Sequence, residues 1–238
     1  MVVKQLLILA GGKGKRLGGE TMNTPKPLVK IVGDTTMLDL LISRYAIYFS
    51  DVVILSGYLS QKITDHVMQN YKDRYPNVRV LIEDEPMGTA GPLLMHKDEL
   101  DEIFFIMNGD TWLSADPRKL GFRDNSASIA QIAVTSVNDA RKYGSVKSDS
   151  MGRIVDFAEK DLSEFNKPGF VNAGWYLVKK KIIDHIDSLP CSLEKDIFPK
   201  LAGKLSLESV ELEGPIFDIG ATTTLEYARK QNLDFYRK

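Results

Sequence analysis

The stretch LLILAGGKGKRLGG, residues 6–19, decides the fold, because a fully apolar run leads directly into a glycine-rich loop with three basic side chains. An apolar run of this length without alternation is typical of a strand that is buried on both faces. Glycines allow backbone N–H groups to turn toward a ligand, and Lys13, Lys15 and Arg16 add positive charge. The stretch therefore indicates a phosphate-binding loop at the end of a parallel strand.

Two familiar phosphate motifs do not fit this loop. A dinucleotide fingerprint G-x-G-x-x-G that starts at Gly12 would need glycine at position 17, where the chain has Leu17. The P-loop G-x-x-x-x-G-K-[ST] fails as well, because Gly14 and Lys15 are followed by Arg16. Taken alone, the loop leaves a structural strand-to-helix turn as the alternative.

The composition of the 238-residue chain excludes several kinds of partner. Its 31 basic and 32 acidic residues give a net charge of −1, so we expect no nucleic acid and no membrane surface as partners. The single cysteine, Cys191, cannot form an intrachain disulfide, and we expect a structural thiol. No apolar run approaches the length of a membrane span, which predicts a cytoplasmic protein. The oligomeric state is left open, with a homodimer as one option.

The order of the predicted elements indicates an α/β fold with a mixed, mainly parallel sheet and helices on both faces. In the first half, predicted strands alternate with helical patterns, and the second half adds an antiparallel insertion. The predicted strands are residues 3–9, 52–56, 78–82, 103–107, 129–137, 144–148, 154–159, 170–178, 205–212 and 216–219. The predicted helices are residues 36–48, 60–71, 91–100, 181–188, 193–201 and 223–235.

Two aspartates are the predicted ligands of a metal ion. Ligands of an open parallel sheet lie beyond the carboxyl ends of its strands, and Asp110 follows the predicted strand 103–107. A turn or a helix N-cap is the alternative for Asp110. A carboxylate that faces a phosphate loop needs an intervening cation, however, and Mg²⁺ held by carboxylates and substrate phosphates provides one. Asp218 lies between apolar residues, where a buried carboxylate requires a partner, and is the second predicted ligand.

Seven motifs together resemble the signature of the sugar-1-phosphate nucleotidyltransferases, in that family's order and over nearly the whole chain. Lys15 is a departure, because the family usually has threonine before the loop arginine. We expect no C-terminal extension for a second activity, and the motifs resemble most closely those of short guanylyltransferases that act on mannose-type or heptose 1-phosphates. The motifs are LAGGKGKRL (residues 9–17) with PKPL (25–28), EPMGTAG (85–91), NGD (108–110), YG (143–144), EK (159–160), VNAG (171–174) and FDIG (217–220).

The resemblance implies a single-domain, Rossmann-like nucleotide-diphospho-sugar transferase fold over residues 1–238. Its nucleotide-binding part would cover about residues 1–112 and its sugar-binding part about residues 113–238. The implied substrates are an NTP and a sugar 1-phosphate, which react to an NDP-sugar and pyrophosphate. We expect GTP with D-glycero-D-manno-heptose 1-phosphate or mannose 1-phosphate. The alternatives are a uridylyl-, thymidylyl- or cytidylyltransferase on another sugar 1-phosphate, and a non-catalytic nucleotide-sugar sensor.

The resemblance also implies a role for each site residue. Arg16, Lys26 and Asp110 are the predicted catalytic residues, and Asp110 and Asp218 the predicted Mg²⁺ ligands. A solvated surface lysine in a proline-rich turn is the alternative for Lys26. The predicted nucleotide-binding residues are Leu9, Ala10, Gly11, Gly12, Gly14, Lys15, Arg16, Glu85, Gly88, Thr89, Ala90, Asn108 and Gly109. The predicted sugar-phosphate-binding residues are Gly144, Glu159, Lys160 and Asn172, with the neighbouring Trp175 interpreted as a core aromatic.

Overall fold

The computed structural model describes residues 2–124, 126–140, 145–158, 168–231 and 236 of the chain. Their contacts divide the chain into two compact units. Unit 1 consists of residues 1–86, 106–114 and 216–238, and unit 2 of residues 87–105 and 115–215. Each unit is built from separate pieces of the chain, so the units do not coincide with the predicted nucleotide-binding part (residues 1–112) and sugar-binding part (residues 113–238). That division concerns function and stays a prediction.

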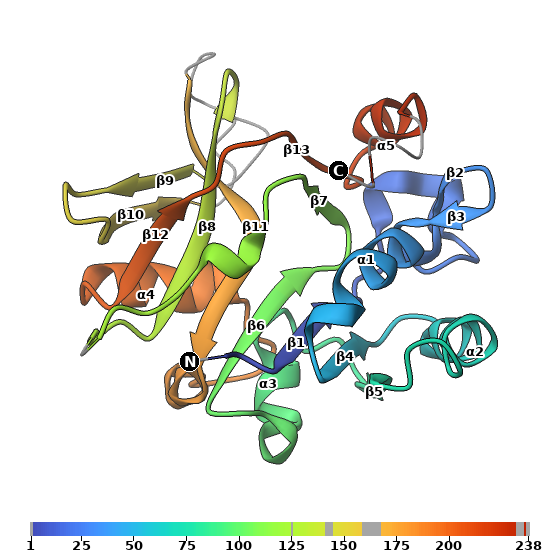
Figure 1. Ribbon diagram of the computed structural model, residues 1–238, viewed down its shortest axis with the longest axis horizontal. Coiled ribbons are helices and arrows are strands. Elements are labelled where there is room, and N and C mark those ends of the chain that lie inside the picture. Colours follow the sequence, from blue (N-terminus) through green and yellow to red (C-terminus); the bar gives the residue numbers. More distant parts are fainter. Residues whose placement is uncertain (1, 125, 141–144, 159–167, 232–235, 237–238) are drawn as a thin grey trace. The chain divides into compact units, whose positions relative to one another are not determined.

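The core of unit 1 is a parallel sheet (Figure 1). Strand β1 (Gln5–Leu9) pairs with β4 (Asp51–Ser56), and β4 pairs with β5 (Val78–Ile82). On its other side β1 neighbours β6 (Ile103–Asn108), whose last three residues belong to this unit. The interior residues of β1 and β4 are buried, which confirms that these apolar runs are strands covered on both faces.

The described part of unit 1 also contains three α-helices and two short antiparallel strand pairs. Helix α1 begins after Thr36 with a capping box, in which the Thr36 hydroxyl accepts from the Asp39 N–H and the Asp39 carboxylate accepts from the Thr36 N–H. Its contacts include β3, and α2 packs against β5. The helices are α1 (Met37–Tyr45), α2 (Ser60–Asn70) and α5 (Thr222–Arg229), and the antiparallel pairs are β2 (Lys30–Val32) with β3 (Thr35–Thr36) and β7 (Thr111–Leu113) with β13 (Ile216–Asp218).

Unit 2 is built around the long strand β11, which is antiparallel to β8 and to β9. Strand β12 joins β8 in parallel, and β9 and β10 form the predicted hairpin. Helix α4 packs against β10 and β12 (Figure 1). The strands are β8 (Ala130–Val137), β9 (Ser145–Ser148), β10 (Ile154–Ala158), β11 (Gly169–Lys179) and β12 (Leu207–Glu211), and the helices are α3 (Gly91–Met95) and α4 (Phe198–Gly203).

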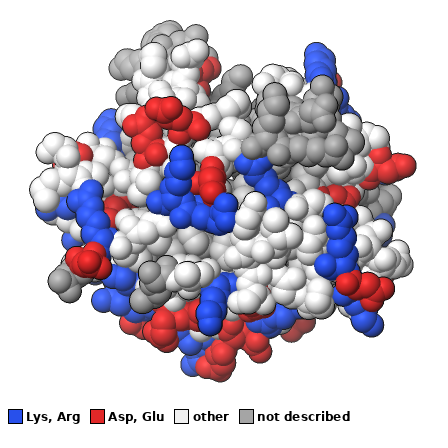
Figure 2. Space-filling model, viewed as in Figure 1, with Lys and Arg blue, Asp and Glu red and all other residues white. Residues whose placement is uncertain are grey.

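The predicted fold class is confirmed, since the sheet is mixed, with parallel strands in unit 1 and an antiparallel insertion in unit 2. The predicted helix at 181–188 is instead a 3-10 turn (Lys180–His185), and the one at 193–201 is a π turn (Leu193–Ile197) followed by α4. Among the described residues, no helix combines the length and the apolar character needed to cross a membrane. On the face that Figure 2 shows, basic and acidic side chains are interspersed, in agreement with the near-zero net charge.

Candidate active site

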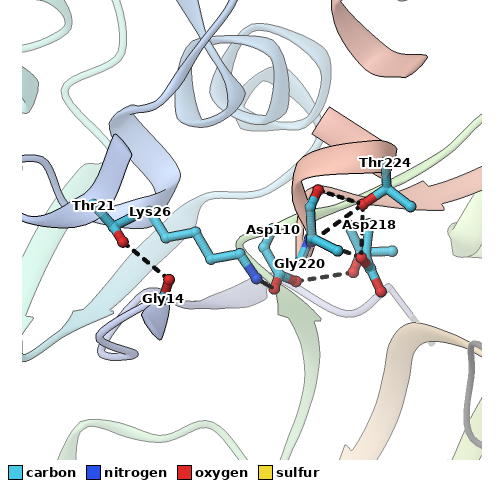
Figure 3. A network of polar contacts seen from close by, with 9 residues as sticks. Gly14, Thr21, Lys26, Asp110, Asp218, Gly220 and Thr224 are labelled. Atoms are coloured by element: carbon cyan, nitrogen blue, oxygen red, sulfur yellow. Dashed lines mark hydrogen bonds and ion pairs between the residues drawn. The ribbon is translucent and has the colours of Figure 1, made fainter. Parts of the chain in front are cut away.

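The glycine-rich loop follows β1 at the carboxyl end of the parallel sheet of unit 1. Thr21 closes the loop, because its hydroxyl donates to the carbonyl of Gly14 at 2.9 Å (Figure 3). Leu17 is buried beneath the loop, whereas Lys15 and Arg16 are exposed. The sequence therefore folds into an anchored loop whose basic side chains are exposed, and its binding of a phosphate stays a prediction.

A buried glutamate lies directly against this loop. Glu83, at the end of β5, is only 7% exposed. A Cβ atom on Gly11 would lie 1.8 Å from Glu83 Oε1, and one on Gly57 would lie 2.6 Å from the same atom, so a larger residue at either position would displace the Glu83 side chain. Glu83 is not among the residues that the motifs predicted, and the exposed Glu85, two residues further on, stays a predicted nucleotide contact. The only available signal was the position of Glu83 at a strand end.

Lys26 is not a solvated surface lysine. Pro25 is extended and Lys26 begins a 3-10 turn (Lys26–Leu28), which directs the chain inward. The Lys26 side chain is 11% exposed, and its ammonium group pairs with the carboxylate of Asp110 (Figure 3). The Gly109 N–H donates to the Leu9 carbonyl at 2.9 Å, so the Asn108–Asp110 segment lies beside the end of β1.

Asp218 reaches the same region through the pairing of β13 with β7. It lies opposite Thr111 in the register, and the Ile219 N–H donates to the Asp110 carbonyl at 2.9 Å. Asp218 is half-buried and not a lone carboxylate, because its Oδ1 accepts from the Gly220 N–H at 2.7 Å (Figure 3). A Cβ atom on Gly220 would lie 3.1 Å from Arg16 Nη2, so the side chain of the loop arginine also reaches the segment that carries Asp218.

Unit 1 thus brings Arg16, Lys26, Asp110 and Asp218 together beside the glycine-rich loop. Two carboxylates next to a site for phosphates are the protein ligands that Mg²⁺ commonly uses, with substrate and water completing its coordination. In the free protein, the Asp110 carboxylate contacts the positively charged ammonium group of Lys26, so its surroundings accept a cation. Among the described residues, no group of three or more His, Cys, Asp or Glu side chains is placed to hold a metal ion.

The remaining predicted residues belong to unit 2. The segment Gly88–Ala90 is clamped against Cys191, whose carbonyl accepts from the Ala90 N–H at 2.9 Å. Cys191 is buried, and burial raises the pKa of its thiol, as expected for a structural cysteine. Asn172 lies on β11, and Trp175 is fully buried, which confirms it as a core residue. Gly144, Glu159 and Lys160 lie outside the described residues.

The comparisons with known proteins agree with this geometry. The sequence profile of the nucleotidyl transferases matches residues 5–233, so the chain belongs to the nucleotidyl transferase family. The predicted resemblance is therefore confirmed, and the profile covers both compact units as one family domain.

Two similar proteins are named as guanylyltransferases that act on mannose 1-phosphate. Mannose-1-phosphate guanylyltransferase 1 of Arabidopsis thaliana is 36% identical over 245 residues, which cover 98% of this chain and 65% of that protein. The mannose-1-phosphate guanyltransferase of Yarrowia lipolytica is 34% identical over 220 residues, or 90% of this chain and 60% of that protein. The chain therefore spans somewhat less than two thirds of the length of these curated relatives.

A solved structure matches over almost its full length. The crystal structure of HddC from Yersinia pseudotuberculosis complexed with GMP-PN superposes with a TM-score of 0.79 at 28% identity, and the match covers 96% of this chain and 99% of that one. The structure of the same protein described without GMP-PN gives a TM-score of 0.81. The named relatives thus confirm the expected similarity to guanylyltransferases, and the match to HddC covers almost all of both chains.

Proposed function

We propose that the chain transfers a guanylyl group from GTP to a manno-configured sugar 1-phosphate, either mannose 1-phosphate or D-glycero-D-manno-heptose 1-phosphate, and releases pyrophosphate. The observation that carries the proposal is the cluster of Arg16, Lys26, Asp110 and Asp218 beside the glycine-rich loop of a nucleotidyl transferase. The names of the guanylyltransferase relatives support the choice of base. We expect the protein to act in the cytoplasm, and a homodimer stays a prediction for light scattering to test.

The chemistry explains why the cluster is charged and contains no nucleophile. An oxygen of the sugar phosphate attacks the α-phosphorus of GTP, the α–β phosphoanhydride bond breaks, and pyrophosphate leaves with the bonding electrons. The attacking oxygen is already an anion, so the reaction needs no general base. The obstacle is repulsion between phosphates, which positioned cations overcome. We assign the triphosphate to Arg16 and the reacting α-phosphate to Lys26.

Asp110 and Asp218 fit a divalent cation such as Mg²⁺, because their carboxylates provide hard oxygen ligands next to the proposed phosphate site. When bound, the metal ion supplies positive charge that neutralises the phosphates. Two side chains supply further positive charge. Lys26 balances the negative charge of Asp110 in the free protein, and Arg16 lies beside the segment that carries Asp218. When substrate and metal bind, the Lys26 ammonium would leave Asp110, at least in part, and contact the α-phosphate.

Glu83 supports guanine as the base. An ionised carboxylate only accepts hydrogen bonds. Guanine presents two adjacent donors, N1–H and the exocyclic amino group, which a carboxylate can accept together. Uracil, thymine and cytosine offer no such adjacent pair of donors on the ring edge. A buried carboxylate beside Gly11 of the nucleotide loop therefore favours GTP.

For the sugar, we retain Asn172, Gly144, Glu159 and Lys160 as proposed contacts, with Lys160 on the sugar phosphate. Discrimination between sugars should depend on hydrogen bonds to hydroxyl groups that one sugar has and another lacks.

A panel of GTP, UTP, dTTP and CTP against mannose, heptose and glucose 1-phosphates, scored by pyrophosphate release, tests the proposal. GTP with a manno-configured sugar phosphate should have the highest kcat/KM. UTP or CTP with glucose 1-phosphate as the best pair would contradict the guanylyl assignment. Nucleotide-sugar binding without turnover of any pair would instead favour the non-catalytic sensor.

A further inference from the structure

Glu194 connects two segments of unit 2 to which substrate binding is assigned. It lies in the first turn after Ser192, yet its side chain does not cap that turn. Its Oε2 accepts from the Thr89 hydroxyl at 2.6 Å and from the Ser192 hydroxyl at 3.0 Å. Its Oε1 accepts from the Tyr176 hydroxyl at 3.2 Å. Each oxygen of the carboxylate thus binds a different group: Thr89 and Ser192 lie on the Oε2 side, and Tyr176 lies on the Oε1 side.

The negative charge of Glu194 determines the direction of the hydrogen bonds on the Oε1 side. Because a carboxylate has no proton to give, the Tyr176 hydroxyl must donate to it. The Tyr176 oxygen then accepts from the Asn172 side-chain N–H at 2.9 Å, and Asn172 Oδ1 accepts from the Gly174 N–H at 2.9 Å. The amide of Asn172 is therefore held in one orientation, with its NH₂ group toward Tyr176.

The same reasoning applies on the Oε2 side. The Thr89 hydroxyl gives its proton to Glu194, so its oxygen accepts from the Leu193 N–H at 2.8 Å. Gly88 has a φ of +79°, and a Cβ atom there would lie 2.2 Å from the Cys191 carbonyl oxygen, so the segment lies tightly against its neighbour. Thr89 is thus held by the turn that carries Glu194.

We propose that Glu194 is a positioning residue that sets the direction of the hydrogen bonds in both segments, and so orients the residues assigned to nucleotide binding at Gly88–Ala90 and to sugar selection at Asn172. The proposal rests on the proposed function, which assigns these two segments to the two substrates. Glu194 acts through Thr89 and through the Tyr176–Asn172 pair, and it touches neither substrate.

Three single variants and a control separate the two sides. Thr89→Val removes the Oε2 side and should raise the Kd for GTP about 3- to 10-fold, with a smaller change in the KM for the sugar phosphate. Tyr176→Phe removes the Oε1 side and should raise the KM for the sugar phosphate about 3- to 10-fold, with the Kd for GTP nearly unchanged. Glu194→Gln presents a donor to one side and removes the negative charge from both, so it should impair both values, the mismatched one by about 10-fold or more. Glu211→Gln, an exposed glutamate at the end of β12, is the matched control.

Double variants test whether Glu194 acts on each side through the assigned residues. Tyr176→Phe should add little to the sugar effect of Glu194→Gln, because both changes interrupt the same side, whereas Thr89→Val and Tyr176→Phe should combine additively. The proposal is overturned if Glu194→Gln matches Glu211→Gln in both constants, or if Glu194→Gln and Tyr176→Phe combine additively. It is also overturned if the variants only lower the thermal midpoint. A wild-type protein that turns over no sugar phosphate would defeat the proposed function itself, a result visible before any variant is made.

Discussion

At the scale of single residues, Lys26 carries the sharpest expectation. Replacing it by methionine keeps the length of the buried side chain and removes the charge that we assign to the reacting α-phosphate. We predict that kcat falls a few hundredfold, equivalent to about 3–4 kcal/mol of transition-state stabilisation, with a smaller change in GTP affinity. Lys30→Met, at an exposed lysine paired with Asp34, is the control. Turnover of Lys26→Met within about twofold of wild type would remove Lys26 from the chemistry.

Glu83 carries the expectation about the base. Glu83→Gln keeps the volume beside Gly11 but places a donor where guanine needs an acceptor. The preference for GTP over UTP, measured as the ratio of kcat/KM values, should fall by about 100-fold or more, because mismatched buried donors are costly. Asp84→Asn alters an exposed neighbour and should leave the ratio unchanged. An unchanged ratio in Glu83→Gln would show that another group recognises the base.

At the scale of elements, Asp39 joins α1 to α2. Its Oδ1 accepts from His66 Nε2 and from the Tyr71 hydroxyl, both at 2.6 Å, while its Oδ2 caps α1 at Thr36. Burial by itself raises the pKa of Asp39, but the hydrogen bonds from His66, Tyr71 and Thr36 outweigh it and lower the pKa to about 2. A lowered folded-state pKa stabilises the fold above the unfolded-state value, and this stabilisation disappears as the pH falls through the folded-state value.

We therefore predict that Asp39→Asn lowers the free energy of unfolding by about 2 kcal/mol at pH 7, measured by urea denaturation. The difference from wild type should shrink between about pH 4 and pH 2, as wild-type Asp39 becomes protonated. Asp65→Asn, at a carboxylate that accepts only an exposed hydrogen bond from Gln61, should cost little at any pH. A constant difference between Asp39→Asn and wild type over this range would refute the assigned pKa.

The elements also show what the sequence could predict. The strands of the parallel sheet of unit 1 were predicted nearly to the residue, with β5 exact, because short, mainly apolar runs leave few alternatives. The short pairs β2–β3 and β7–β13 were not predicted in full, since β2, β3 and β7 have only two or three residues, and β7 pairs with a strand far along the chain. The turn at Leu193–Ile197 has helical periodicity but π geometry, which periodicity cannot distinguish.

The candidate site was predictable where a motif marks it and unpredictable where only three-dimensional contact does. The glycine-rich loop, Lys26, Asp110 and Asp218 were all named, and unit 1 brings them together. Glu83 and Glu194 were missed, because an acidic residue outside a motif looks like a solvated one until its neighbours are known. Their neighbours come from other strands and turns, as far away as residue 11 for Glu83 and residue 89 for Glu194.

At the scale of the whole molecule, substrate binding should be visible as stability. A ligand that binds only the folded chain at 100 times its Kd adds about 2.7 kcal/mol to the free energy of unfolding. For a chain of 238 residues, we predict that GTP with Mg²⁺ raises the thermal midpoint by roughly 5–10 °C. The measurement is differential scanning fluorimetry with GTP and Mg²⁺, GTP and excess chelator, and Mg²⁺ alone.

The three conditions separate the metal from the nucleotide. Asp110 and Asp218 repel a triphosphate unless a cation lies between them, so GTP in chelator should give a much smaller shift than GTP with Mg²⁺. Mg²⁺ alone should give almost none, because two carboxylates, one of them paired with Lys26, form only part of a coordination shell. Asp218→Asn should lose most of the metal-dependent part of the shift and keep the part that GTP gives in chelator. Equal shifts with chelator and with Mg²⁺ would show that the nucleotide binds without a metal ion and would remove the two-aspartate site from the proposed mechanism.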